Sequence, residues 1–243
     1  MNAMKRNLVV NIWSDIACPW CYVGKRRLEA ALELFPHRDS VEIVWRAFEL
    51  DPSAPRVQDS SVSYVQRLAN KYRKTAGEAQ QMIDRMANVA KGDGLDFHFE
   101  RAKPGNTFDA HRVSHFAREH GKQSAVYERL LHAYMSEGES IGDRDVLARL
   151  AADVGLDEAE VRAQLESTAH ADAVRADEAE ARELGIQGVP FFVLGGRYAV
   201  SGAQSAEHLL AALNQAWSDL AAKPVTFAEG DACGPDGCPV PSA

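Results

Sequence analysis

The sequence predicts an α/β fold in which a long all-helical segment separates an opening strand–helix–strand unit from a terminal β-hairpin and helix. Three observations support this prediction. β-rich runs occur only near the two ends of the globular part, apolar residues recur at intervals of three and four through the middle, and glycine or proline stands at most boundaries. With 243 residues, 46% hydrophobic and 26% charged, the chain has the composition of a globular protein.

The opening unit begins with residues 8–14, an apolar run rich in β-branched residues that predicts a strand. A helix is predicted after Cys18, where apolar residues become spaced by three and four, and it ends before Pro36. Residues 41–48 (VEIVWRAF) predict a second strand. This βαβ unit places Cys18 at the carboxyl end of a strand, where open α/β sheets carry their chemistry.

The middle of the chain, residues 62–184, has helical patterns and no convincing strand. Its last stretch, residues 158–184, predicts one solvated helix with a single apolar stripe. Sheet character returns at residues 189–194 and 197–200, which flank a two-glycine turn and predict a β-hairpin. Residues 206–220 then predict an amphipathic helix.

These elements divide the chain into three parts. We expect residues 1–55 and 185–222 to form one domain and residues 56–184 to form a helical insertion domain. Residues 223–243 are expected to form a flexible tail, because they are rich in Gly, Asp and Pro, and this tail carries a Cys-x4-Cys pair.

Composition excludes several classes of partner. Lys and Arg total 27 against 35 Asp and Glu, and the net charge of −8 repels nucleic acid. No run approaches the roughly 20 apolar residues of a membrane helix, and the apolar run at residues 8–10 is too short for a signal peptide. We therefore expect a cytoplasmic protein without a nucleic-acid or membrane partner, and the sequence sets no oligomeric state.

The two cysteine pairs indicate redox chemistry or metal binding, because pairs so close in sequence do not staple a fold. In Cys18-Pro19-Trp20-Cys21, the proline suits the first helical position, which makes Cys18 the N-cap with its sulfur over free amides. The helix dipole and the cations of residues 25–27 would favour a Cys18 thiolate. We predict that Cys18 is the nucleophile and that Cys21, one turn inward, resolves the mixed disulfide.

Metal binding is the alternative for Cys18 and Cys21. A structural zinc site needs four ligands, and the other cysteines, Cys233 and Cys238, lie in the tail, so no metal or cofactor is expected. His111 and His115 have a spacing that can chelate a metal, but the residue after His111 is Arg112, where zinc proteases have Glu. Histidines at the surface or at the edge of the core are the simpler interpretation.

Two further residues bear on the same chemistry. The Val189-Pro190 bond at a predicted strand start indicates either a tight turn with a cis peptide bond or an edge-strand proline without function. An ionised Asp15 would oppose a nearby thiolate, so this residue is interpreted first as a turn or capping residue and second as a proton-transfer group.

Four segments together resemble the DsbA-like branch of the thioredoxin fold, and specifically the cytosolic FrnE-type proteins. They are residues 14–24, 106–112, 188–192 and 201–204, and the resemblance covers residues 8 to about 220.

The resemblance implies a thioredoxin fold interrupted by an all-helical insertion domain. It also implies that Cys18 attacks, Cys21 resolves, and Pro190 is a cis-proline whose loop faces them. The backbone of Val189 is then expected to pair with substrate by strand addition, with Trp20 and His111 as further substrate contacts.

Three functions from different classes follow. The first is a thiol-disulfide oxidoreductase or isomerase acting on protein or small-thiol disulfides, with glutathione as a candidate partner. The second is a glutathione-dependent isomerase or transferase of the 2-hydroxychromene-2-carboxylate isomerase or kappa type, but those relatives generally carry Ser at the attacking position. The third is metal storage by four thiolates. Trp20 stands where DsbA has a charged His, which favours reductase, isomerase or redox-defence work over bulk oxidation.

The tail pair, Cys233 and Cys238, brackets Gly-Pro-Asp-Gly, a turn sequence that lets the two sulfurs meet. The residues before Cys233 can extend about 35 Å, against a radius of gyration of about 18 Å for a globule of this length. We predict that this pair exchanges electrons with Cys18 and Cys21 as a redox relay.

Overall fold

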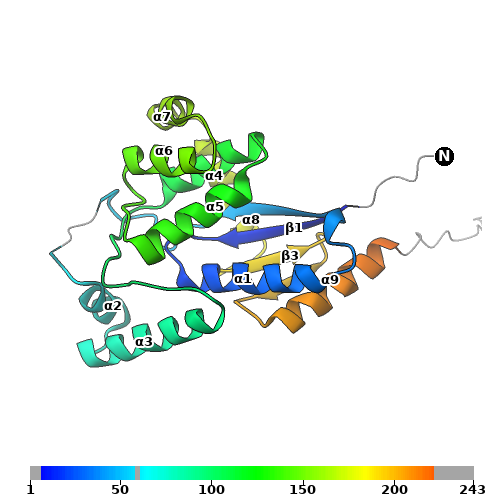
Figure 1. Cartoon of the computed structure of the whole chain (residues 1–243), viewed down its shortest axis with the longest axis horizontal. Helices are drawn as coiled ribbons and strands as arrows, with labels where there is room; N and C mark the ends of the chain where they lie inside the picture. The colour runs from blue at the N-terminus through cyan, green and yellow to red at the C-terminus, as the bar shows by residue number, and fades with distance from the viewer. Residues whose placement is uncertain (1–6, 58–60, 222–243) are drawn as a thin grey trace, which may run out of the picture.

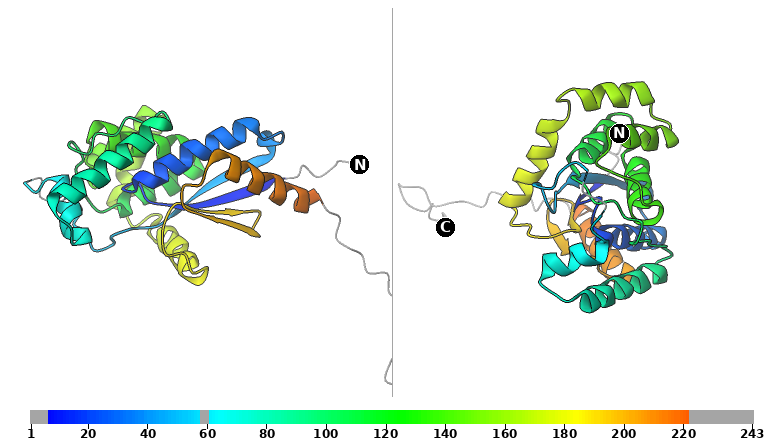
Figure 2. Two further views of the ribbon diagram at one scale, coloured as in Figure 1. Left: turned by 90° about the horizontal axis from the view of Figure 1, so that it is seen from below. Right: turned by 90° about the vertical axis from the view of Figure 1, so that its left-hand side faces the viewer.

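The computed structural model describes residues 7–57 and 61–221. Its sheet has four strands in the order β2-β1-β3-β4, and helices α1 and α9 cover one face while α8 covers the other (Figures 1 and 2). The strands are β1 (Leu8–Ser14), β2 (Val41–Ala47), β3 (Phe191–Leu194) and β4 (Tyr198–Ser201). β1 pairs in parallel with β2 and antiparallel with β3, which forms a hairpin with β4. All four predicted strands are confirmed.

The chain between β2 and β3 is helical, as predicted. Figure 1 shows α4 to α7 stacked beyond β2, and α2 with α3 beyond the end of the sheet where α1 begins. The helices are α1 (Pro19–Leu34), α2 (Tyr64–Tyr72), α3 (Ala76–Gly92), α4 (Phe108–Glu119), α5 (Gln123–His132), α6 (Arg144–Asp153), α7 (Glu158–Glu166), α8 (Ala171–Glu183) and α9 (Ala206–Ala221), with short turns η1 (Arg38–Ser40) and η2 (Ala133–Glu137).

Alternation along β1 gives the sheet two apolar faces. Leu8, Val10 and Ile12 are fully buried in the main core, which continues from the sheet into the helical part of the chain. Trp13 points the other way and packs with Ala181 and Ile186, at the C-terminal end of α8 and just after it. This period of two is the pattern from which the strand was predicted.

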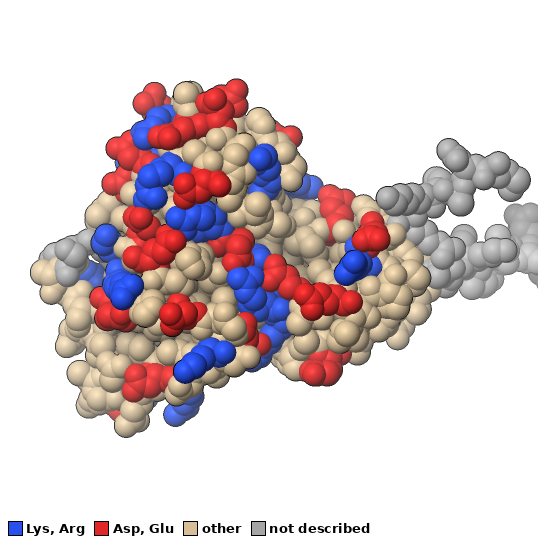
Figure 3. All heavy atoms as spheres, viewed as in Figure 1, with Lys and Arg blue, Asp and Glu red and all other residues tan. Residues whose placement is uncertain are grey.

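Charged side chains of both signs are interspersed on the face seen in Figure 3. Within the described residues, no helix has both the length and the apolarity that crossing a bilayer requires.

The prediction of one solvated helix over residues 158–184 is wrong. The chain forms α7 and α8 with a break between them, and α8 buries Val174, Asp177 and Ala181 against the sheet. The break is held by Arg112, whose buried guanidinium donates to the carbonyls of Gln164, Ser167 and Ala169. These carbonyls lie at and just past the end of α7, where the helical hydrogen bonds run out, and the arginine donates to them there.

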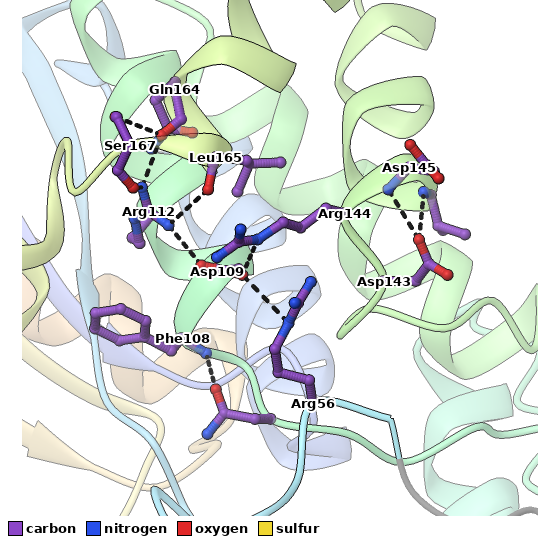
Figure 4. A network of polar contacts seen from close by, with 12 residues as sticks. Arg56, Phe108, Asp109, Arg112, Asp143, Arg144, Asp145, Gln164, Leu165 and Ser167 are labelled. Carbon is purple, nitrogen blue, oxygen red and sulfur yellow. Dashed lines mark hydrogen bonds and ion pairs between the residues drawn. The ribbon is translucent and has the colours of Figure 1, made fainter.

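Arg112 is itself fixed by a carboxylate (Figure 4). Asp109 accepts from Arg112 at 2.7 Å and from Arg144 at 2.7 Å, and Arg56 lies 3.6 Å away. Burial alone would raise the pKa of Asp109, but hydrogen bonds from Arg144 and Arg112 lower it below its ordinary value. Asp109 thus joins three segments of the helical part.

Candidate active site

Cys18 stands at the start of α1, directly after the turn that follows β1. It is the N-cap residue and Pro19 occupies the first turn, as expected, and the Cys21 N–H donates to the Cys18 carbonyl at 3.0 Å. Both cysteines are free thiols, 5% and 1% exposed. Burial and a hydrogen bond with Cys18 raise the pKa of Cys21 well above its ordinary value. Cys18 is therefore the more accessible thiol of the pair.

The Cys18 sulfur faces the loop before β3. Its thiol donates to the Val189 carbonyl at 3.7 Å and makes no capping hydrogen bond to α1, so the expectation that the sulfur caps free helix amides is wrong. The Val189–Pro190 peptide bond is cis. Gly24 lets this loop approach α1, because a Cβ at Gly24 would lie only 2.8 Å from Cγ of Pro190.

The three cations of residues 25–27 do not serve the Cys18 thiolate. Each forms an ion pair with a carboxylate: Lys25 with Glu128 at 2.6 Å, Arg26 with Glu29 at 2.7 Å, and Arg27 with Asp93 at 3.0 Å. A charge neutralised by a neighbour contributes little field at a distance of two helical turns, about 10 Å. The expectation that these cations favour a Cys18 thiolate is therefore wrong. Instead, these residues join α1 to α5 and to the end of α3.

Asp15 lies beside Cys18 and is 1% exposed. Its carboxylate accepts hydrogen bonds from the backbone N–H groups of Ala17 at 3.2 Å and Leu50 at 2.8 Å, which fits the turn role expected of it. His111 lies behind it, with Nε2 3.6 Å from the Asp15 carboxylate and 1% of the side chain exposed. The structure thus places His111 behind the active-site wall, whereas a substrate contact was expected.

Three buried polar atoms near the cysteines have no hydrogen-bond partner: Ser14 Oγ, His111 Nε2 and Tyr127 OH. Burial raises the pKa of Tyr127 well above its ordinary value, and the nearby Cys21 raises it further. Such unsatisfied groups are uncommon in protein interiors and often mark strained or reactive sites. Of these groups, only the His111 imidazole has a basic nitrogen that can take up a proton, whereas the neutral hydroxyls of Ser14 and Tyr127 can only relay one. Sequence reasoning missed Ser14 and Tyr127, because each occupies an ordinary core position of its element.

His115 does not join His111 in a metal site. Its Nε2 lies 2.8 Å from the Asp177 carboxylate of α8. Within residues 7–57 and 61–221, no three His, Cys, Asp or Glu side chains come together as metal ligands. Cys233 and Cys238 lie outside the described residues.

A pocket of about 810 Å³ opens in front of Cys18. Asp15, Cys18, Pro19 and Trp20 line one side of it, and α2 and α3 form the opposite wall. Trp20 is 44% exposed, whereas Val189 and Pro190 are not among the pocket residues. The sequence predicted the apolar stripes of residues 62–72 and 82–89 only as helical, and several of their members line this pocket.

Comparison with known proteins identifies relatives of the whole fold. The profile of the DSBA-like thioredoxin domain matches residues 9–214. The uncharacterized protein YwbO of Bacillus subtilis is 32% identical over 192 residues, which span 76% of this chain and 86% of that protein. The crystal structure of a probable DsbA oxidoreductase from Streptomyces coelicolor is 46% identical, with a TM-score of 0.83 over 97% of this chain and 100% of that chain. A 2-hydroxychromene-2-carboxylate isomerase shares the fold at 16% identity, with a TM-score of 0.64 over 88% of this chain and 98% of that chain.

Proposed function

The chain belongs to the family of DsbA-like thioredoxin domains, and we propose that it is a thiol-disulfide oxidoreductase that works through Cys18 and Cys21. One observation carries the proposal. The more accessible cysteine stands at the N-cap position of α1, borders an open pocket and faces the Val189–Pro190 loop, while the second cysteine lies one turn behind it. This order of exposure is what sequential attack requires.

The reaction takes place in two exchanges. The Cys18 thiolate attacks a substrate disulfide, a mixed disulfide forms, and the first substrate thiol leaves. Cys21 then attacks the Cys18 sulfur, the bond between Cys18 and the substrate sulfur breaks, and the proton of Cys21 leaves with the second substrate thiol. The substrate gains two electrons and the chain ends with a Cys18–Cys21 disulfide. The reverse sequence oxidises a dithiol, and neither direction uses a cofactor.

Substrates of this proposal are protein or small-thiol disulfides, with glutathione as a candidate partner, in the cytoplasm and without nucleic acid or membrane. In this proposal, the Val189 backbone and Trp20 contact a substrate held at Cys18. The FrnE-type assignment within the family stays a prediction. So does the relay through Cys233 and Cys238, which would carry electrons between Cys18 and a second disulfide.

The test begins with a chain carrying Cys233→Ser and Cys238→Ser, so that only Cys18 and Cys21 react. The reduced protein is mixed with bis(hydroxyethyl) disulfide, the reaction is quenched with acid, and the intact mass is measured by mass spectrometry. We expect an internal disulfide in this background, a stable mixed disulfide after Cys21→Ser, and neither product after Cys18→Ser on the same timescale. Equal reaction of the Cys18→Ser protein would remove Cys18 from the mechanism.

Restoring the tail cysteines tests the relay in the same assay. In the Cys21→Ser protein we then expect a disulfide between Cys18 and Cys233 or Cys238, mapped by peptide mass. A mixed disulfide that persists unchanged in the presence of both tail cysteines would contradict the relay and leave the Cys18 assignment intact.

A further inference from the structure

Cys18 reacts from the wall of a pocket. Its side chain is 5% exposed and borders the pocket of about 810 Å³. That volume lies within the roughly 300–1,000 Å³ typical of small-molecule sites. A compact disulfide fits within such a space.

The wall opposite Cys18 is apolar and partly aromatic. Its apolar members include Tyr64 and Leu68 of α2 and Ile83 and Met86 of α3, with Phe99 stacked on Tyr64. The rings of Tyr64 and Phe99 stack with centroids 5.1 Å apart and present aromatic surface next to the methionine and leucine side chains. Flat apolar groups gain affinity from burial against such a wall.

Cations lie among the pocket residues, although the whole chain is acidic at −8. Arg67 and Lys71 come from α2, and Arg85 from α3. The pocket has two carboxylates, and both are held by hydrogen bonds. Asp15 accepts from two backbone N–H groups, and Asp51 accepts from the N–H and hydroxyl of Ser53. Lys71 and Arg85 are exposed and make no ion pair with a described residue, so they are available to an anion.

Resting on the proposed function, we propose that the pocket selects disulfides of low molecular mass that combine an aromatic or apolar body with a carboxylate. The Cys18 thiolate attacks one sulfur, the bond between the two substrate sulfurs breaks, and the first anionic thiolate leaves. Cys21 then displaces the second thiolate, so that two electrons reduce the substrate and the one proton of the Cys21 thiol is released. The disulfide itself is the oxidant.

Three probe disulfides separate charge from shape. Dithiobis(nitrobenzoate) is aromatic and carries two carboxylates, dithiodipyridine is aromatic and neutral, and cystamine is aliphatic and cationic. Second-order rate constants are measured with the reduced full-length chain carrying Cys233→Ser and Cys238→Ser. Each constant is divided by that of mercaptoethanol with the same probe, which removes the intrinsic reactivity of the disulfide. We expect the normalised rate for dithiobis(nitrobenzoate) to exceed that for cystamine by about tenfold or more.

Charge variants then locate the effect. The double substitution Lys71→Ala and Arg85→Ala is expected to lower the normalised rate with dithiobis(nitrobenzoate) by about five- to tenfold, and that with dithiodipyridine by less than about twofold. Lys91→Ala is the matched control, because Lys91 is an exposed cation of α3 that does not line the pocket. It changes the net charge in the same direction and is expected to leave all three rates within about 1.5-fold.

The outcomes separate the two proposals. Equal normalised rates for all three probes, or a double variant that behaves like Lys91→Ala, would overturn the selectivity inference and leave the oxidoreductase proposal standing. A chain whose Cys18 reacts with no probe and with no bis(hydroxyethyl) disulfide would overturn both. The inference is supported if the double variant loses the preference for dithiobis(nitrobenzoate) and the Lys91→Ala variant keeps it.

Discussion

Gly24 sets how closely α1 approaches the Val189–Pro190 loop. An alanine Cβ there would lie 2.8 Å from Cγ of Pro190 and 3.3 Å from the ring of Phe192. Alanine gains about 1 kcal/mol in helix propensity, but overpacking against a proline ring costs about 1–3 kcal/mol. We expect Gly24→Ala to destabilise the fold by about 1 kcal/mol and to slow the reaction of Cys18 severalfold, since the loop that faces its sulfur must shift.

Gly77→Ala is the control for this prediction. A Cβ at Gly77, in the first turn of α3, meets no atom within 4 Å, so this substitution is expected to stabilise the chain by about 0.5 kcal/mol. Urea unfolding gives both stabilities, and the rate with dithiodipyridine reports on Cys18. Gly24→Ala protein as stable and as reactive as Gly77→Ala protein would refute the close-approach argument.

The residues at the start of α1 were predictable because their signals are local. Proline at the first helical position and cysteine before it specify an N-cap without reference to the rest of the chain. The fate of Lys25 was not predictable in this way, because its partner Glu128 lies in a helix about a hundred residues later. A charge in a sequence does not reveal whether a distant carboxylate neutralises it.

The strand β2 forms one edge of the sheet and is completed there by side chains from two helices. Gln123 of α5 accepts from the Trp45 N–H at 3.1 Å and donates to the Trp45 carbonyl at 2.9 Å. Asp177 of α8 accepts from the Ala47 N–H at 2.9 Å. These contacts satisfy an edge that would otherwise expose unpaired backbone groups to a second strand.

We expect Gln123→Met to lower the free energy of unfolding by about 2 kcal/mol, because it keeps the side-chain length and leaves two buried backbone groups without partners. Gln66→Met removes an exposed hydrogen bond to Asn70 in α2 and is expected to cost less than about 0.5 kcal/mol. Urea unfolding of the two variants makes the comparison. An equal loss in both would show that Gln123 does not complete the strand.

The distinction between local and long-range signals also explains which elements were predicted well. Strand periodicity and glycine turns are local, so β1 to β4 were found within two residues of their ends. The break between α7 and α8 carries neither glycine nor proline, and its carbonyls are held by Arg112, more than fifty residues away in sequence. The pocket also depends on residues far apart in sequence, since α2 and α3 reach Cys18 only in the folded chain.

Ion pairs join α1 to the helical part of the molecule and make its stability depend on pH. Glu128 of α5 accepts from the Tyr22 hydroxyl at 2.5 Å and contacts Lys25 and Arg26. Burial alone would raise the pKa of Glu128, but hydrogen bonds from Arg26 and Lys25 lower it from 4.5 to about 2. Between these values the unfolded chain binds more protons at this residue than the folded chain, so acid favours unfolding.

The stabilisation by Glu128 is therefore complete above about pH 5 and is lost as the pH falls toward 2. We expect Glu128→Gln to cost about 1–2 kcal/mol near pH 6, allowing for solvent screening of a side chain that is 29% exposed, and less than half of that near pH 3. Urea unfolding of both proteins across this range gives the difference between their free energies of unfolding. The titration of the other carboxylates is common to both proteins and cancels in this difference. Glu166→Gln, at an exposed carboxylate at the end of α7, is expected to show no such trend. A difference between wild type and Glu128→Gln that stays constant from pH 6 to 3 would mean that these ion pairs do not couple α1 to α5.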